Sequence, residues 1–336
     1  MVVLRASVCV AAVAVALLYV PALLIEKRFH ASTHEFYSEL SGRVGDLVQT
    51  PLGSMHYVKQ GAPTAPLCLV MHGITVSAIY MQPLVDALVE RGLQTIAFDF
   101  LGRGHSSSLG LDRAYTTDVY VQQVAGLLDA LGLHEQPVHL VALSMGGAVA
   151  AEFAARYPTR VLSINLMAPA GVPFKMPWTA EVLRYEPLGR LLLSSPLGHF
   201  IMSSRFAKSF AQPERYLDDL DRLQQELQFH VEKPGFAHAI SSTVANFDSL
   251  HDATTAYTQI GKVHKGCVSL FWGTNDTTVP LEPGARLLQQ MIPHLSLHTF
   301  DGVGHSLIFE RTAVIAENIA KCVKGTHAPS TVTNHK

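Results

Sequence analysis

A serine, an aspartate and a histidine occur in this chain in an order and at a spacing that suit nucleophilic catalysis. Ser144 comes first, Asp276 follows it by 132 residues, and His305 follows Asp276 by 29 residues. A serine hydroxyl is a weak nucleophile at neutral pH, so it needs a base to take its proton and a carboxylate to orient that base. We therefore interpret Ser144 as the candidate nucleophile, His305 as the base and Asp276 as the orienting acid.

The residues around Ser144 predict a sharp turn from a strand into a helix. Residues 138–143 form a continuous apolar run of strand type, and a small-residue pattern of helix type continues from Gly146 to about residue 157. Such a nucleophile elbow holds its serine in a strained conformation and has room only for small neighbours. Gly146 fits the pattern G-x-S-x-G, but Ala142 replaces the first glycine. The alternative is a strand–helix turn with an incidental serine.

Asp276 and His305 each follow a predicted strand. Residues 267–272 lead into the loop that contains Asp276, and residues 295–300 lead into the loop that contains His305. Asp301 is an alternative acid, but we prefer Asp276 because an acid on a separate strand end can approach the imidazole from behind. Asp276 as a simple helix cap and His305 as a chance loop histidine are the remaining alternatives.

Two backbone amides are expected to form an oxyanion hole. The first is that of Met145, the residue after the nucleophile. The second comes from the loop after the predicted strand 67–71, where Gly73 lets the chain turn, and we select the amide of Ile74. His72 is expected to hold this loop by hydrogen bonding.

The elements that must position these residues alternate between buried strands and helices. After a hairpin at about 44–59, the pattern predicts strands at 67–71, 95–98, 138–143 and 161–167 and helices at 81–91, 118–131 and 146–156. Continuous apolar strands separated by helices predict a mostly parallel sheet with helices on both faces. We interpret the stretch from Asp99 to Ser106, at another strand end, as a structural turn with a buried Asp99.

The alternation defines two core segments separated by an insertion. Residues 44–171 form the first part of the core, and residues 172–262 are helical and rich in large apolar side chains. We expect them to form a helical cap over the strand ends, mostly packing against the core and partly lining an apolar tunnel for an acyl chain. Residues 263–323 supply the rest of the core, and the polar tail 324–336 is expected to be disordered.

The N-terminus predicts a membrane anchor within residues 1–28. Residues 6–25 carry no charge, and a helix of that length spans about 30 Å, the thickness of a bilayer core. A retained single-pass anchor is favoured over a cleaved signal peptide, because the apolar sequence continues past the A-x-A-like site at 14–16 as far as residue 25. A glycosylation sequon at 275–277 includes the candidate acid Asp276. A glycan there would be hard to accommodate, which favours a cytosolic-facing catalytic domain.

The composition indicates which classes of partner and cofactor to expect. The chain has 336 residues, 48% hydrophobic and 15% charged, with a formal net charge of −2, which gives no reason to expect a nucleic-acid partner. The 17 histidines are interpreted as scattered surface or core residues, so neither a metal nor an organic cofactor is expected. The four cysteines have no C-x-x-C spacing and are interpreted as small buried hydrophobes without a disulfide framework. No obligate protein partner is predicted.

Together these motifs resemble the α/β-hydrolase superfamily. His72-Gly73, the stretch 99–106, the elbow at Ser144, Asp276 with Val279-Pro280, and Gly304-His305 match it in order and spacing over about residues 44–323. The resemblance implies the α/β-hydrolase fold and the Ser-Asp-His triad. A serine nucleophile distinguishes the chain from haloalkane dehalogenases and epoxide hydrolases, whose nucleophile at this place is an aspartate.

Within the superfamily, the N-terminal apolar segment and the S-M-G-G elbow look like membrane-anchored monoacylglycerol lipases. This resemblance implies a serine hydrolase of carboxylic esters that acts on monoacylglycerols or related small-molecule lipid esters at a membrane through an acyl-enzyme. The carbon–carbon bond hydrolases of aromatic degradation are similar in pattern. A hydrolase of that kind, a small-ester esterase, and a non-catalytic binding protein of the same fold remain as alternatives.

Overall fold

The computed structural model describes residues 45–173, 178–325 and 332–335. The predicted membrane anchor at 6–25 lies outside these residues. Within the described ranges, no helix combines the length and the apolar character needed to cross a bilayer.

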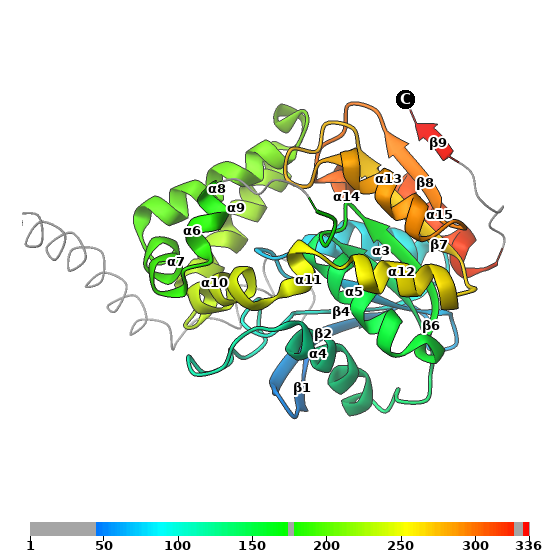
Figure 1. Ribbon diagram of the computed structural model, residues 1–336, viewed down its shortest axis with the longest axis horizontal. Coiled ribbons are helices and arrows are strands. Elements are labelled where there is room, and N and C mark those ends of the chain that lie inside the picture. Colours follow the sequence, from blue (N-terminus) through cyan, green and yellow to red (C-terminus); the bar gives the residue numbers. More distant parts are fainter. Residues whose placement is uncertain (1–44, 174–177, 326–331, 336) are drawn as a thin grey trace, which may run out of the picture.

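The described residues form one mixed sheet, in the order β1-β2-β4-β3-β5-β6-β7-β8-β9 (Figure 1). Its strands are β1 Asp46–Thr50, β2 Gly53–Gln60, β3 Leu67–Met71, β4 Gln94–Phe98, β5 Val138–Leu143, β6 Val161–Met167, β7 Val268–Gly273, β8 Ser296–Phe300 and β9 Val332–His335. β1 and β2 pair antiparallel with each other and β2 pairs antiparallel with β4, whereas all other neighbours are parallel. Every residue of β3, β4 and β5 is buried. The mostly parallel sheet predicted from the apolar runs is confirmed.

Helices cover the sheet in two groups. α3 Gln82–Glu90 packs beside α15 Thr312–Val323, and α5 Met145–Arg156 packs between α4 Thr117–Ala130 and α12 Thr254–Val263, which also contacts α13 Leu281–Met291. The chain runs from β3 outward to β4 and then back past β3 to β5, so right-handed crossovers place α3 and α4 on opposite faces. The reversal beside β3 creates the switch point at which α/β proteins bind ligands.

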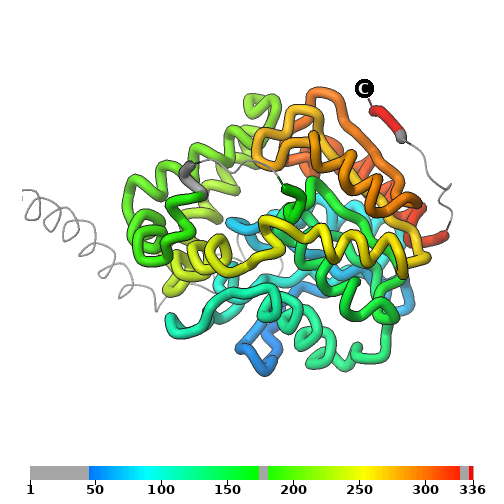
Figure 2. Tube along the Cα trace, viewed as in Figure 1, coloured from blue at the N-terminus to red at the C-terminus, as the bar shows by residue number. Residues whose placement is uncertain are grey.

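The cap is a cluster of five helices between β6 and the second core segment. They are α6 Trp178–Leu183, α7 Glu186–Leu193, α8 Pro196–Ser209, α9 Leu217–Glu232 and α10 Phe236–Asn246. They pack mainly on one another and lie to one side of the sheet, in green to yellow-green (Figure 1, Figure 2).

The predicted boundary 172–262 is too wide at its C-terminal end. α11 Asp248–His251 and α12 both pack against α5 in the core. Helical periodicity alone does not distinguish a cap helix from a core helix, which explains the difference.

The expectation that residues 324–336 are disordered is wrong for β9. Residues 332–335 pair in parallel with β8, the Asp301 N–H donates to the His335 carbonyl at 3.0 Å, and the His335 ring stacks on Phe300. β8 offers an unpaired edge that a short segment can complete. This pairing depends on the folded sheet. The sequence of residues 332–335, in a polar tail, does not predict a strand by itself.

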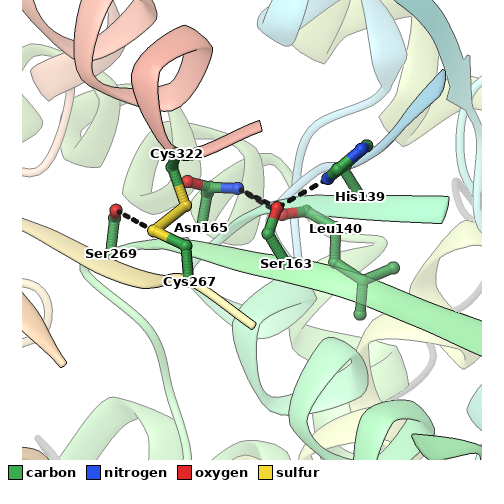
Figure 3. The surroundings of a disulfide bond; sticks show 7 residues. All are labelled: His139, Leu140, Ser163, Asn165, Cys267, Ser269 and Cys322. Atoms are coloured by element: carbon green, nitrogen blue, oxygen red, sulfur yellow. Dashed lines mark hydrogen bonds between the residues drawn. A yellow bond between two sulfur atoms is a disulfide. The ribbon is translucent and has the colours of Figure 1, made fainter. Parts of the chain in front are cut away.

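The expectation of no disulfide is also wrong. Cys267, directly before β7, is bonded to Cys322 in α15, and their Cα atoms lie 5.6 Å apart (Figure 3). The two cysteines are 55 residues apart in the sequence, and only the packing of the helix on the sheet brings them together. Cys68 is buried and free.

The disulfide is expected to stabilise the second core segment against unfolding. Closing a loop of this length restricts the unfolded chain and contributes about 4 kcal/mol in the chain-entropy model. We predict that reduction lowers the free energy of unfolding of the wild type by up to about that amount, measured by urea denaturation with and without reductant. The Cys267→Ala/Cys322→Ala variant should not respond to reductant. Equal unfolding midpoints for the reduced and oxidised wild type would contradict the prediction.

Candidate active site

Ser144 lies on a strained turn between β5 and α5. Its φ and ψ angles are 53° and −118°, a backbone conformation that residues other than glycine rarely adopt. Three backbone hydrogen bonds fix the turn: the Ser144 N–H donates to Met167, and the Ser144 carbonyl accepts from Gly147 and Ala170, all at 2.9 Å. The serine side chain thus projects from the carboxyl edge of the sheet, as the elbow pattern predicts.

Close packing around this turn explains the small residues on either side. A Cβ on Gly146 would lie 2.8 Å from the carbonyl oxygens of both Met71 and His72. Helix α5 therefore begins directly against the end of β3. Ala142 is fully buried in β5 between the partners Met71 and Leu166, so its methyl group is accommodated where the usual pattern has glycine.

Asp276 and His305 meet at the same edge. Nδ1 of His305 lies 2.7 Å from Oδ2 of Asp276, and the other carboxylate oxygen accepts the N–H groups of Thr278 and Val279 at 2.8 and 2.9 Å. Both side chains are largely buried. The alternative acid, Asp301, is exposed and contacts Thr274 instead. The structure therefore pairs the histidine with Asp276 and leaves Nε2 for proton exchange.

Ser144 and His305 occupy the same carboxyl edge, because β5, β6, β7 and β8 are parallel neighbours. Both side chains are partly accessible, with 8% and 9% of the residue surface exposed. Among the hydrogen bonds of the described residues, none joins the Ser144 hydroxyl to the imidazole. Catalytic hydrogen bonds of this type often tighten only in the complex with substrate.

The loop from His72 to Ser77 lies beside the serine. A Cβ on Gly73 would be 3.6 Å from the Cβ of Ser144. Burial lowers the pKa of His72 to about 4, so its ring is neutral: Nδ1 donates to the Gly73 carbonyl at 2.7 Å, and Nε2 accepts the Phe100 N–H at 3.0 Å. His72 thus holds the loop, as expected from the sequence.

The two selected amides border the serine from different elements. Met145 is the first residue of α5, so its N–H has no acceptor within the helix. Ile74 is partly buried one residue after Gly73. Among the hydrogen bonds of the described chain, none is donated by the Ile74 N–H. The arrangement can supply two backbone donors to a developing oxyanion.

The turn after β4 is structural, as expected. Asp99 is fully buried and accepts from His56 at 2.7 Å, from the Ala78 N–H at 2.8 Å and from the His105 N–H at 2.9 Å. Burial by itself raises the pKa of this carboxyl, but His56, His72 and the Ala78 N–H together hold the pKa well below its usual range. A Cβ on Gly104 would overlap the carboxylate, which explains the glycine there. Asp99 thereby ties the turn to the loop that carries Ile74.

A serine and a histidine are in contact elsewhere in the sheet. Nδ1 of His139 is 2.8 Å from the Ser163 hydroxyl, with the Asn165 amide 3.3 Å from the same oxygen (Figure 3). His139 and Ser163 are almost fully buried, and burial lowers the pKa of His139 to about 4. His139 is near the start of β5, at the opposite end from Ser144. We interpret this cluster as a structural set of buried polar groups in the core, in which Oδ1 of Asn165 has no hydrogen-bond partner among the described residues.

Comparison with known proteins identifies the family of this chain. Residues 62–312 match the family model described as serine aminopeptidase, S33. The chain belongs to this family. It is a hydrolase with the α/β-hydrolase fold.

Its curated relatives include proteins with two kinds of name. The monoacylglycerol lipase abhd6-B of Xenopus laevis is 24% identical over 271 residues, which cover 76% of this chain and 74% of that protein. A 2-hydroxy-6-oxononadienedioate/2-hydroxy-6-oxononatrienedioate hydrolase of Burkholderia vietnamiensis is 29% identical over 228 residues, 66% of this chain and 73% of that protein. Both relatives are hydrolases by name.

Solved structures show the same fold. A meta-cleavage product hydrolase from Pseudomonas fluorescens IP01 superposes with a TM-score of 0.69 at 21% identity, over 84% of this chain and 99% of that one. A membrane phospholipase A, titled a novel bacterial virulence factor, superposes with a TM-score of 0.66 at 23% identity, over 96% and 97% of the two chains.

Strain at the elbow of this hydrolase is measurable without any substrate. Ser144→Gly and Ser144→Ala both remove the hydroxyl, but glycine adopts positive φ without steric cost. We predict that Ser144→Gly is more stable than Ser144→Ala by about 1 kcal/mol or more, measured by urea unfolding. Ala142→Gly in the adjacent unstrained strand is the matched control and should be destabilising. Equal stabilities at position 144 would refute strain at this turn.

Proposed function

We propose that this hydrolase is a serine esterase that cleaves carboxylic esters, with monoacylglycerols or related lipid esters as substrates. The observation that carries the proposal is the 2.7 Å contact between His305 and Asp276 at the sheet edge that also presents Ser144 on its strained turn. This set of side chains supplies a nucleophile, a base and an orienting carboxylate.

In the proposed mechanism, the Ser144 hydroxyl attacks the ester carbonyl while Nε2 of His305 accepts its proton. Asp276 receives the Nδ1 hydrogen bond and stabilises the imidazolium. The amides of Met145 and Ile74 bind the oxyanion, and His305 then protonates the departing alcohol. Water, activated by the same imidazole, attacks the acyl-enzyme and releases the acid. These steps require no metal or organic cofactor.

Two observations favour a lipid ester. Several relatives are named monoacylglycerol lipases. In addition, the cap buries a set of large apolar side chains: Leu193, Met202, Phe206, Phe210, Leu220, Leu223 and Leu227. An apolar cap that contacts the loop after β3 and the residue after His305 suits an acyl chain. The proposed anchor at residues 6–25 would hold the catalytic domain at a lipid surface.

Carbon–carbon bond hydrolysis is the second candidate. It is favoured by the 29% identity to the Burkholderia vietnamiensis hydrolase and by the fold shared with a meta-cleavage product hydrolase. The same triad serves both reactions, so the substrate must be tested directly.

We predict that Ser144→Ala lowers turnover of a p-nitrophenyl ester by about 10⁴-fold or more, because the nucleophile is lost. Asp276→Asn should cause a loss of similar order, because the imidazole loses its partner; Asp301→Asn is the matched control. Activity is measured on glycerol esters from C4 to C18 and on a ring-fission dienoate, alongside labelling by a fluorophosphonate. Retention of most activity by Ser144→Ala would refute the mechanism. Turnover of the dienoate alone would favour the second candidate.

The disulfide indicates the compartment of the catalytic domain, and with it the orientation of the proposed anchor in the membrane. Disulfides persist in oxidising compartments and are rare in the reducing cytosol. The bond between Cys267 and Cys322 therefore favours a domain outside the cytosol, against the cytosolic orientation expected from the sequence. Asn275 of the sequon is exposed, so a glycan on its side chain could extend into solvent although Asp276 is the next residue.

This orientation predicts that both cysteines are protected from alkylation in the cell. Cells are denatured in the presence of a polyethylene-glycol maleimide, with and without prior reduction, and the mass shift of Cys68→Ala protein is followed on a gel. Additional shifts that appear only after reduction are expected, and Cys267→Ala/Cys322→Ala should lack them. Full alkylation without reductant would place the domain in a reducing compartment.

A further inference from the structure

A carboxylate of the cap contacts the loop that carries Ile74. Glu226, on the cap helix α9, is 2% exposed, and its Oε1 accepts the Ser77 N–H at 3.1 Å and also the Ser77 hydroxyl. Nε2 of His230, one turn further along α9, lies 3.1 Å from the same oxygen. The cap and the loop are therefore joined by a buried cluster of polar groups.

This contact has energetic consequences for both partners. A buried carboxylate is costly unless donors surround it, and hydrogen bonds to an ionised acceptor are stronger than neutral ones. Two of the three donors to Oε1 come from Ser77. Moving Ser77 away would leave Glu226 without most of its compensation, so α9 and the loop constrain each other.

Ser77 is three residues from Ile74 in the same short loop, and the loop ends at η1 Ala78–Met81. A second link reaches the same segment. Arg103 is fully buried, its Nε donates to the Ile74 carbonyl at 3.1 Å, and its guanidinium also donates to Thr243 of α10 at 2.8 Å. The cap thus contacts this loop directly through Glu226 and indirectly through Arg103.

We propose that Glu226 is a positioning residue for the oxyanion hole. It holds Ser77, and with Ser77 the backbone of the loop whose Ile74 N–H binds the oxyanion, so that seating of the cap completes the site. The inference rests on the proposed serine-hydrolase mechanism. Oxyanion donors act only at hydrogen-bond distance, and a misplacement of about 1 Å costs about 10²-fold in rate.

The experiment compares Glu226→Gln, Ser77→Ala and the double variant with Glu232→Gln. Glu232 is a carboxylate at the end of the same helix, but it is exposed and contacts Gln228. For each protein we measure kcat and KM on the best ester, the inhibition constant of a trifluoromethyl ketone, the rate of fluorophosphonate labelling and the melting temperature. The ketone forms a tetrahedral adduct whose oxyanion requires the same amides.

We expect Glu226→Gln to lower kcat by about 10- to 100-fold with KM nearly unchanged. Binding of the ketone should weaken, and fluorophosphonate labelling should slow, by similar factors. Ser77→Ala retains its N–H and should cause a smaller loss in the same direction. The loss in the double variant should be smaller than the product of the two single losses, because both changes weaken the same contact between Ser77 and residue 226. Glu232→Gln should match the wild type.

Several outcomes would overturn the inference. One is a lower melting temperature for Glu226→Gln with kcat, ketone binding and labelling unchanged, because Glu226 would then only attach the cap. Another is independent, multiplicative losses in the double variant. If Glu226→Gln fails to fold, the same measurements of kcat, ketone binding and labelling rate on Ser77→Ala test the inference.

The labelling rate separates this inference from the proposed function. It reports on the oxyanion hole even if the natural substrate is not an ester. Slower labelling of Glu226→Gln in a protein that hydrolyses no ester would support the positioning role and refute the ester substrate. A wild-type protein that is not labelled at Ser144 would refute both.

Discussion

The tight turn between β5 and α5 is the constraint on which the site depends. It places Ser144 at a positive φ angle, with neighbouring chain segments too close for larger residues at Gly146. Backbone hydrogen bonds to the end of β6 and the chain beyond it hold the turn in this conformation. Ala168, after β6, also has a positive φ angle. Strain of this kind persists only where surrounding structure determines it, and it concentrates at functional sites.

Parallel strands then bring the remaining groups to the same edge. β3 leads into the loop with Ile74, β7 leads to Asp276, and β8 leads to His305. Each group is held by buried polar contacts: Asp276 by two backbone N–H groups, and His72 by the Gly73 carbonyl and the Phe100 amide. Buried polar networks of this kind rigidify a site when every member has a partner.

The cap takes part in the same polar organisation. Glu226 contacts Ser77 in the loop that carries Ile74, and Ser209 of α8 contacts Ser306, directly after His305. The Ser306 hydroxyl is also 2.9 Å from the Tyr80 phenol, whose pKa is raised, chiefly by burial. The cap therefore contacts two loops that carry members of the proposed machinery, which makes it part of the site's architecture.

The sequence by itself was enough to predict the mostly parallel sheet, the tight turn at Ser144 and the pairing of Asp276 with His305. The oxyanion hole at Met145 and Ile74 is also a prediction from the sequence and stays a proposal. These features follow from local patterns: apolar runs, small residues at a turn, and chemistry-bearing residues at strand ends. Only the tertiary structure decided the end of the cap, the strand β9, the disulfide and the contact between Ser77 and Glu226. These depend on segments that meet after folding, and no local periodicity records which distant partner a cysteine, a strand edge or a buried carboxylate will find.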